Sequence, residues 1–251
     1  MNLTNGSLFS GAGGFELGAT WQGIKTIWNC EIVEARRKLL KKRFPNAKQY
    51  TDITKLTNPG YTDIICGGFP CQDISIAQQT NGGAKGIKGD RSGLWSEMFR
   101  ICRTVKPRYI LIENSSMLAT RGLEQVLCDI SKIGYYAEWR SLRGFDFGLL
   151  DKRERIYIIA YTQPKRCASN NEITQCFREI LPKRTPGQIA LSMPIKRYGR
   201  RDNLQGIRMD NEFSRELDKD RIEAMGNAVK PIIASYLYKC IKEHYKLTQK
   251  Q

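Results

Sequence analysis

Residues 7–19 read SLFSGAGGFELGA, a short apolar run that passes through closely spaced glycines into a helical pattern. Glycine at positions 11 and 13 lets a ligand approach the backbone where a larger side chain would block it. The helix that follows offers free N–H groups and the positive end of its dipole. On its own, this turn fits a dinucleotide, nucleotide or S-adenosylmethionine site, or a purely structural turn.

Outward from this turn, short β-type runs alternate with helical patterns. Strands are predicted to end at Phe9 and to span Lys25–Cys30, Asp63–Cys66, Arg108–Glu113, 136–143 and 155–161. Helices are predicted over Gly14–Gln22, Val33–Arg43, Leu94–Val105 and Leu118–Ile133, the last one closed by Gly134. This alternation predicts an α/β fold with a doubly wound, mostly parallel sheet.

The pattern changes after Tyr161. Residues 163–219 carry prolines, scattered basic residues and the run KRYGRR at 196–201, without clear periodicity. Helical character returns from Asp220, and a last helix is predicted from Pro231 to about Tyr245. We therefore predict a main domain of residues 1–162 plus 220–251 and a small irregular second lobe of residues 163–219.

The charge balance favours a polyanionic partner. The net charge is +16, from 41 basic and 25 acidic residues, and nucleic acid is the commonest such partner, although a basic surface can also serve solubility alone. The sequence contains no run of 18 apolar residues, so no transmembrane helix is predicted. The N-terminus lacks the layout of a signal peptide, so a cytoplasmic protein without a membrane partner is expected.

Cysteine and histidine usage narrows the chemistry. None of the eight cysteines forms a CxxC pair, and without an export signal a disulfide framework is not expected. The single histidine, His244, disfavours a zinc site and Ser-His or Cys-His catalysis, so no metal is expected. A nucleophilic cysteine here would need another group to handle protons.

Acidic residues follow two predicted strands. Glu31 closes TIWNCE, where a carboxylate can accept from both hydroxyls of a ribose, and Asp52 follows a short third strand, where it can accept from an adenine amino group. A helix N-terminal carboxylate and a helix cap are the structural alternatives. Two acids at successive strand ends after a glycine-rich turn favour the ligand site.

Residues 67–75, GGFPCQDIS, place Cys71 after a strand, at the edge of the sheet where α/β proteins bind ligands. Cys71 could be a nucleophile, a metal ligand, half of a disulfide or a buried structural residue. Glu113 ends the strand RYILIE and could donate to a ring nitrogen of a bound base if burial raises its pKa. Arg153 and Arg155 are predicted on one strand face, beside the cysteine or on a solvated edge strand.

The ordered set FSGAGGFELG, Glu31, Asp52, GGFPCQDIS, RSGLWSEMFRI, ENS, RERIYIIA and GNAVKP resembles the DNA (cytosine-5)-methyltransferase family, in a compact form with a short target-recognition region. The resemblance covers residues 7–161 and about 220–240. Its departures are Asp151 in place of a glutamine, Ser115 in place of a valine, and an altered segment before GNAVKP.

The resemblance implies an S-adenosylmethionine-dependent methyltransferase fold and a set of site residues. The cofactor pocket would be lined by Phe9, Gly11, Gly13, Gly14, Glu31, Ile32, Asp52, Ile53, Leu94, Asn227 and Ala228. Cys71 would attack C6 of a cytosine flipped from double-stranded DNA, and C5 would take the methyl group. Glu113 would hold the ring N3 and amino group, Arg155 would contact O2, and Arg153 would support it.

The resemblance also implies a monomeric enzyme encoded by a bacterium or a phage. Residues 76–92 would close over the base, and residues 163–219 would recognise the target. The alternatives are the same chemistry on tRNA, a silent DNA-binding homologue and a nicotinamide-dependent oxidoreductase. The Pro-Cys-Gln context favours DNA over tRNA, the joint presence of Cys71, Glu113 and Arg155 disfavours a silent homologue, and the missing GxGxxG disfavours the oxidoreductase. The target sequence and a partner restriction enzyme stay open.

Overall fold

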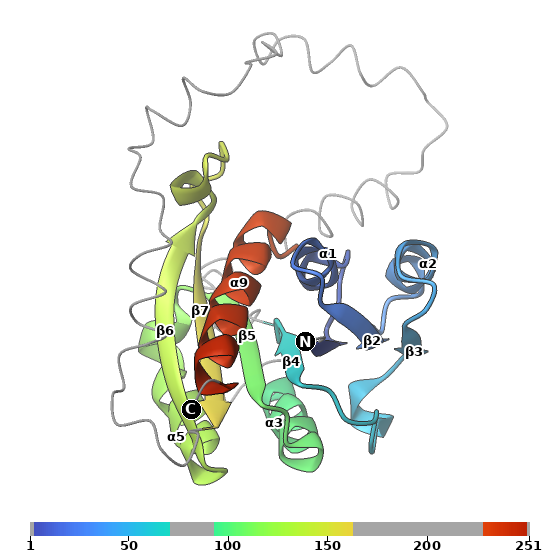
Figure 1. The fold of residues 1–251 in the computed structure, drawn as a ribbon, viewed down its shortest axis with the longest axis horizontal. Helices are drawn as coiled ribbons and strands as arrows, with labels where there is room; N and C mark the ends of the chain where they lie inside the picture. Colours follow the sequence, from blue (N-terminus) through green and yellow to red (C-terminus); the bar gives the residue numbers. More distant parts are fainter. Residues whose placement is uncertain (1–2, 71–92, 163–227, 250–251) are drawn as a thin grey trace, which may run out of the picture.

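The computed structural model describes residues 3–70, 93–162 and 228–249 (Figure 1). The strands are β1 Thr4–Leu8, β2 Lys25–Cys30, β3 Lys48–Tyr50, β4 Ile64–Gly67, β5 Tyr109–Ser115, β6 Tyr135–Arg143 and β7 Glu154–Thr162. The helices are α1 Gly14–Trp21, α2 Glu34–Arg43, α3 Leu94–Val105, α4 Leu118–Arg121, α5 Leu123–Lys132 and α9 Pro231–Gln249, with the 3-10 helices η1 Ile53–Lys55 and η4 Gly144–Phe147.

These strands form one seven-stranded sheet in the order β3-β2-β1-β4-β5-β7-β6. The strands from β3 through β5 are parallel, and β7 runs antiparallel to both β5 and β6. The predicted α/β class with a mostly parallel sheet is therefore confirmed. Because β7 is antiparallel, its first residues meet the carboxyl end of β5, where Ser115 pairs with Arg155. This register brings Glu113 of β5 and Arg155 of β7 to the same edge of the sheet.

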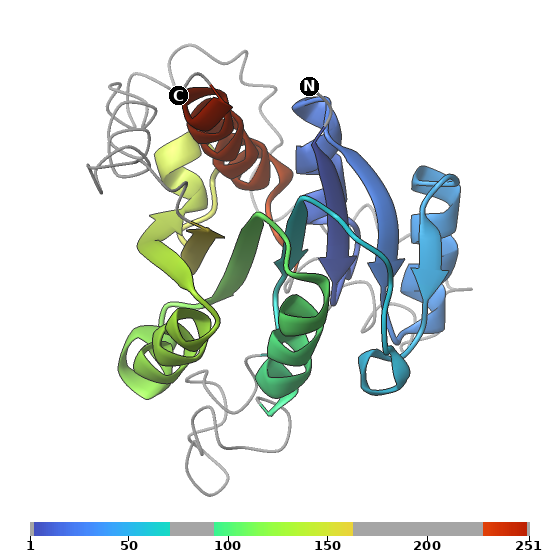
Figure 2. The ribbon, with the colours of Figure 1, turned by 60° about the horizontal axis from the view of Figure 1, so that its bottom comes forward.

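Two apolar layers cover the sheet. Residues of α3 and α5, such as Met98 and Val126, are fully buried against one face. Residues of α1 and α9, such as Phe15 and Leu237, fill the other. Figure 2 shows α9 on one side of the sheet and α3 and α5 on the other. The inner strands β4 and β5 and the middle of β7 are buried on both faces, which explains their apolar runs, whereas the edge strands β3 and β6 are partly exposed.

Helices α1 and α9 touch closely although they lie at opposite ends of the sequence. A Cβ atom added to Gly18 of α1 would stand 2.6 Å from the Cβ of Ala234 in α9. The start of α9 is thereby held beside the glycine-rich turn that precedes α1. This packing places the C-terminal segment of the chain at the same edge as the strand ends.

The element boundaries differ from the sequence predictions mainly at two places. The helix predicted over Leu118–Ile133 is divided into α4 and α5 at Gly122, whose backbone is not helical (φ 165°, ψ 0°). The last helix continues to Gln249 rather than ending near Tyr245. Gly134 has the predicted left-handed conformation, with φ 84°. The predicted second lobe, residues 163–219, lies outside the described residues, so the domain division stays a prediction.

Within residues 3–70, 93–162 and 228–249, none of the helices combines the length and the apolar content needed to cross a bilayer. No group of three or more His, Cys, Asp or Glu side chains within those ranges is arranged to hold a metal ion. None of the cysteines in the described ranges is in a disulfide; four are buried and Cys128 is exposed.

Candidate active site

A cavity of about 280 Å³ opens at the carboxyl ends of the parallel strands. Its size lies near the lower end of the range for small-ligand pockets. It is lined by Phe9, Gly11, Cys30, Glu31, Ile32, Arg36, Thr51, Asp52, Ile53, Thr54, Gly68, Phe69, Pro70, Leu94, Glu113, Arg155 and Ala228. The cavity therefore joins most of the predicted cofactor residues to Glu113 and Arg155.

Glu31 is the buried acid of the cofactor side. One carboxylate oxygen accepts from the Gly11 N–H at 2.7 Å, and the other accepts from the Val33 N–H at 2.9 Å. Each oxygen still has a free lone pair, so the group can accept further hydrogen bonds from hydroxyls in the cavity. Gly11 has φ 56°, a conformation that suits glycine, and this turn presents its N–H to Glu31.

Apolar side chains form the rest of the cofactor side. Phe9 lines the cavity with φ 53°, an uncommon backbone conformation for a bulky residue that is found mainly where function requires it. Ile32 lines it too and is 71% exposed, while Ile53 and Leu94 complete the apolar wall. Apolar walls beside a hydrogen-bonded carboxylate suit a ligand with a flat ring and vicinal hydroxyls. These residues fit S-adenosylmethionine.

Asp52 is held at the end of a short loop. Its Oδ1 accepts from the backbone N–H of Thr54 at 2.9 Å and from the Thr54 hydroxyl at 2.7 Å, so it caps η1 while lining the cavity. These hydrogen bonds lower the pKa of the Asp52 carboxyl. Asp52 therefore caps η1, one of the two alternatives from the sequence, and also lines the cavity, while its contact with a ligand stays a prediction.

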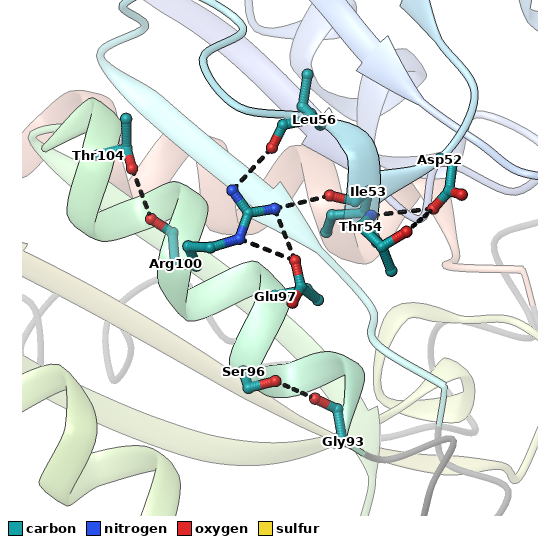
Figure 3. Close-up of polar contacts among 9 residues, drawn as sticks. All are labelled: Asp52, Ile53, Thr54, Leu56, Gly93, Ser96, Glu97, Arg100 and Thr104. Atoms are coloured by element: carbon teal, nitrogen blue, oxygen red, sulfur yellow. Dashed lines mark hydrogen bonds and ion pairs between the residues drawn. The ribbon is translucent and has the colours of Figure 1, made fainter.

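Arg100 ties this loop to helix α3 (Figure 3). Its guanidinium donates to the carbonyl oxygens of Leu56 and Ile53, each at 2.8 Å, and pairs with Glu97 at 2.6 Å. The arginine lies within the sequence run RSGLWSEMFRI, but no role was predicted for it. Its carbonyl partners lie more than 40 residues away and leave no local signal.

Gly13 and Gly14, two of the predicted cofactor residues, are not among the residues that line the cavity. A Cβ at Gly13 would meet the Phe44 ring at 2.8 Å, and one at Gly14 would meet the Val229 carbonyl oxygen at 2.1 Å. Both positions therefore require glycine for packing behind the turn. Asn227 lies outside the described residues, whereas Ala228 does line the cavity.

Glu113 and Arg155 form an ion pair at the other side of the cavity. The Nε atom of Arg155 lies 3.2 Å from Oε1 of Glu113, across the β5–β7 ladder. Burial raises the pKa of the Glu113 carboxyl, and the positive charges of Arg155 and Arg153 partly oppose that shift. A carboxyl group in this setting can hold a proton closer to neutral pH than a solvated glutamate can.

The chain that leads to Cys71 packs directly on Glu113. A Cβ at Gly68 would stand 2.8 Å from Oε2 of Glu113, so the lack of a side chain at Gly68 leaves room for this carboxyl group. The Asn114 amide donates to the carbonyl oxygen of Phe69 at 3.0 Å and fixes the residue before Pro70. Cys71 itself lies outside the described residues, as does the predicted closing loop 76–92. Gly68 and Asn114 stand inside the quoted motifs, but only the sheet register reveals their contacts.

Arg153 differs from the prediction. Strand β7 begins at Glu154, so Arg153 precedes the strand and does not share a cavity-lining position with Arg155. Its guanidinium instead donates to the carbonyl oxygen of Ala228 at 2.7 Å. Arg153 therefore contacts Ala228, which lines the cavity, rather than lining the cavity itself. Its positive charge still opposes the rise in the pKa of Glu113.

Comparison with known proteins relates this geometry to one family. The family model for C-5 cytosine-specific DNA methylase matches residues 3–198. The chain is 34% identical to the Type II methyltransferase M2.BsuMI of Bacillus subtilis over 63% of this chain and 42% of that protein. It is 30% identical to M.Sau3AI of Staphylococcus aureus over 82% of this chain and 54% of that protein. The chain thus spans about half the length of these curated relatives.

A solved structure of the Entamoeba histolytica methyltransferase EhMeth has a similar fold over nearly the whole length. The match has a TM-score of 0.65 at 15% identity and covers 98% of this chain and 99% of that one. At this identity the likeness concerns the fold alone. It agrees with the α/β architecture described above.

Proposed function

Because this chain belongs to the C-5 cytosine-specific DNA methylase family, we propose that it methylates C5 of cytosine in double-stranded DNA with S-adenosylmethionine as the donor. The observation that carries the proposal is the single cavity shared by the Glu31 side and the Glu113–Arg155 pair. A methyl donor and an extruded base must meet in one space, and these two groups of residues face the same space.

The donor side is assigned to the residues that line the cavity beside β1 and β2. Glu31 would accept from ribose hydroxyls, and Asp52 would accept from the adenine amino group. Phe9 and Ile32 would provide the apolar surfaces for the ring. When bound, S-adenosylmethionine supplies an electrophilic methyl group for transfer to carbon.

Cys71 is the proposed nucleophile. Its thiolate would form a bond to C6 of a flipped cytosine, and the displaced electron pair would make C5 nucleophilic toward the methyl group. After transfer, C5 would lose its proton to solvent, the electron pair would return to the ring, and the C6–S bond would break. The thiol is reactive as its thiolate, which nearby positive charge favours.

Glu113 and Arg155 are proposed to hold the base. A protonated Glu113 would donate to ring N3 and accept from the exocyclic amine, which withdraws electrons from C6. Arg155 would neutralise charge that develops on O2. Arg153 would act from behind, through its contact with the carbonyl oxygen of Ala228.

Target recognition is assigned to the lobe of residues 163–219, and closure over the base to residues 76–92. The excess of basic residues would contact phosphates on both sides of the extruded base. We propose that the protein acts as a monomer, because the chain itself carries every residue type that the reaction requires.

The proposal is tested by incubating the protein with radiolabelled S-adenosylmethionine and duplex DNA of varied sequence, followed by bisulfite sequencing. Label is expected in DNA, at one defined cytosine context. A Cys71→Ala variant should transfer no label yet bind the cofactor nearly as well as the parent protein. Label found only with a tRNA substrate, or turnover that survives the substitution, would refute the assignment.

A further inference from the structure

The C-terminal segment that carries Ala228 is gripped from two sides. On one side, the Val229 carbonyl oxygen packs so closely on Gly14 that a Cβ atom added to Gly14 would stand only 2.1 Å from it. On the other side, Arg153 donates to the Ala228 carbonyl oxygen at 2.7 Å. Residues 228–231 therefore bridge the glycine-rich turn before α1 and the start of β7.

The next residue, Lys230, makes an ion pair that belongs to the same bridge. Its Nζ atom lies 2.8 Å from Oδ2 of Asp151, and each side chain is 30% exposed. The Oδ1 atom of Asp151 accepts from the Arg153 N–H at 2.9 Å, so one carboxylate holds both Lys230 and the backbone of Arg153. These contacts lower the pKa of Asp151, so the group is charged at neutral pH.

Asp151 is itself held firmly by the β6–β7 connection. Its carbonyl oxygen accepts from the Phe145 N–H at 2.8 Å, which closes the connection over η4. Phe147 of η4 packs edge-to-face on Tyr236 of α9, with ring centroids 5.2 Å apart. The carboxylate of Asp151 is therefore a fixed acceptor toward which Lys230 is drawn.

We infer that Asp151 is a positioning residue which, through Lys230 and Arg153, latches the C-terminal segment against β7 and so sets the wall of the cavity at Ala228. The latch would couple cofactor binding to the position of β7, the strand that bears Arg155. This consequence rests on the proposed function. Asp151 and Lys230 line no part of the cavity as described, so they act through Ala228 and Arg153.

The test measures binding of S-adenosylhomocysteine by calorimetry to the full chain and to Asp151→Asn, Lys230→Met and the double variant. An ion pair of this exposure predicts a roughly two- to five-fold loss of affinity in each single variant at low salt. The double variant should lose no more affinity than either single variant. Lys230→Arg, which keeps the positive charge, should bind as the parent protein does. At roughly 0.5 M salt the parent protein should approach the variants.

The exposed Glu243–Lys246 pair of α9, at 2.9 Å, supplies the matched control, because Glu243→Gln removes an ion pair remote from the cavity. Unchanged affinity in the single variants, or losses that add in the double variant, would overturn the latch.

Hydrogen exchange of the ligand-free protein separates this inference from the proposed function. Asp151→Asn and Lys230→Met should each speed amide exchange in residues 228–235 about two- to five-fold. If the parent protein binds no S-adenosylhomocysteine but these variants show faster exchange, the proposed function fails and the latch stands. Exchange that is equal in all variants overturns the latch whatever the ligand does.

Discussion

The two sides of the cavity are held together in different ways. On the cofactor side, defined by Gly11, Glu31 and Asp52, the polar contacts join residues that are close in sequence, two positions apart for Asp52 and Thr54 and 20 apart for Gly11 and Glu31. On the base side, defined by Gly68, Glu113 and Arg155, the contacts cross the sheet, as between Asn114 and Phe69, which are 45 positions apart.

Because of this difference, contacts on the cofactor side can be removed one at a time, whereas contacts on the base side depend on one another. On the cofactor side, Asp52 and Thr54 bond within one turn, Gly11 and Glu31 bond between neighbouring strand ends, and Arg100 of α3 holds the Asp52 loop. The base side exists only when β4, β5, β7 and the C-terminal segment have assembled. Substitutions on the cofactor side should therefore change ligand affinity, whereas those on the base side should change the rate of chemistry or the stability of the assembly.

The largest effect is expected at Glu113. Glu113→Gln keeps the size of the side chain but removes the acid, so the methylation rate should fall by roughly 10²- to 10⁴-fold. Affinity for S-adenosylhomocysteine should change little, because the substitution lies on the base side. Steady-state kinetics and calorimetry measure the two quantities, and Glu124→Gln on the exposed face of α5 is the matched control. A loss confined to cofactor affinity would break the proposed division of the cavity.

The next effect concerns the stability of the assembly of β5, β7 and α9, at the end of β5 opposite the cavity. His244 of α9 is buried between Tyr109 of β5, whose hydroxyl lies 2.8 Å from Nδ1, and the ring of Tyr161 of β7, with centroids 4.8 Å apart. Burial lowers the pKa of His244 from 6.5 to about 4. The unfolded chain therefore takes up the proton first as pH falls, and stability from the neutral imidazole is complete above pH 6.5 and lost toward pH 4.

Between neutral pH and pH 4, the parent protein should lose about 3 kcal/mol more unfolding free energy than His244→Gln, because of this pKa shift. Glutamine retains a donor and an acceptor for Tyr109 but does not titrate in this range. Denaturant unfolding of both proteins across the pH range measures the difference. Parallel curves for the two proteins would contradict a neutral buried imidazole.

On the cofactor side, Glu31→Gln should weaken S-adenosylhomocysteine binding by roughly 10- to 100-fold. The reason is that the amide nitrogen would face the N–H of Gly11 or Val33, leaving a buried donor without an acceptor. Calorimetry gives the affinity, and Glu34→Gln, an exposed residue of α2 paired with Lys38, is the control. Equal affinities for the two variants would remove Glu31 from the binding site.

The smallest effect is expected at Arg100. Arg100→Met removes the donors to the carbonyl oxygens of Ile53 and Leu56, so the loop that carries Asp52 should loosen. Cofactor affinity should fall about five-fold, the effect of roughly one net hydrogen bond. Arg103→Met, an exposed position on the same helix, should leave affinity unchanged. A larger effect at Arg103 than at Arg100 would show that the loop is held by other contacts.

The fold and several site residues could be predicted where short sequence motifs mark the ends of strands. The alternation of strands and helices predicted the sheet, and the positions of Glu31, Asp52 and Glu113 at strand ends placed them near one edge. The same reasoning missed the break at Gly122, because a lone glycine in a helical pattern does not reveal whether the helix continues.

Contacts between distant parts of the chain could not be predicted in the same way. Arg153 and Ala228 are 75 positions apart, and nothing near either residue indicates the other. The expectation that Arg153 and Arg155 share a strand face failed because β7 begins at Glu154. Such contacts depend on the register of an antiparallel strand that closes an otherwise parallel sheet.

The central claim is that the thiolate of Cys71 bonds transiently to C6 of an extruded cytosine. It is tested most directly with a duplex in which the target base is 5-fluorocytosine, because fluorine replaces the proton whose loss would release the enzyme. With S-adenosylmethionine present, the account predicts a denaturant-stable protein–DNA adduct whose cross-linked peptide contains Cys71, and no adduct with Cys71→Ala. Failure to trap the active parent enzyme, or an adduct at another residue, would contradict the account.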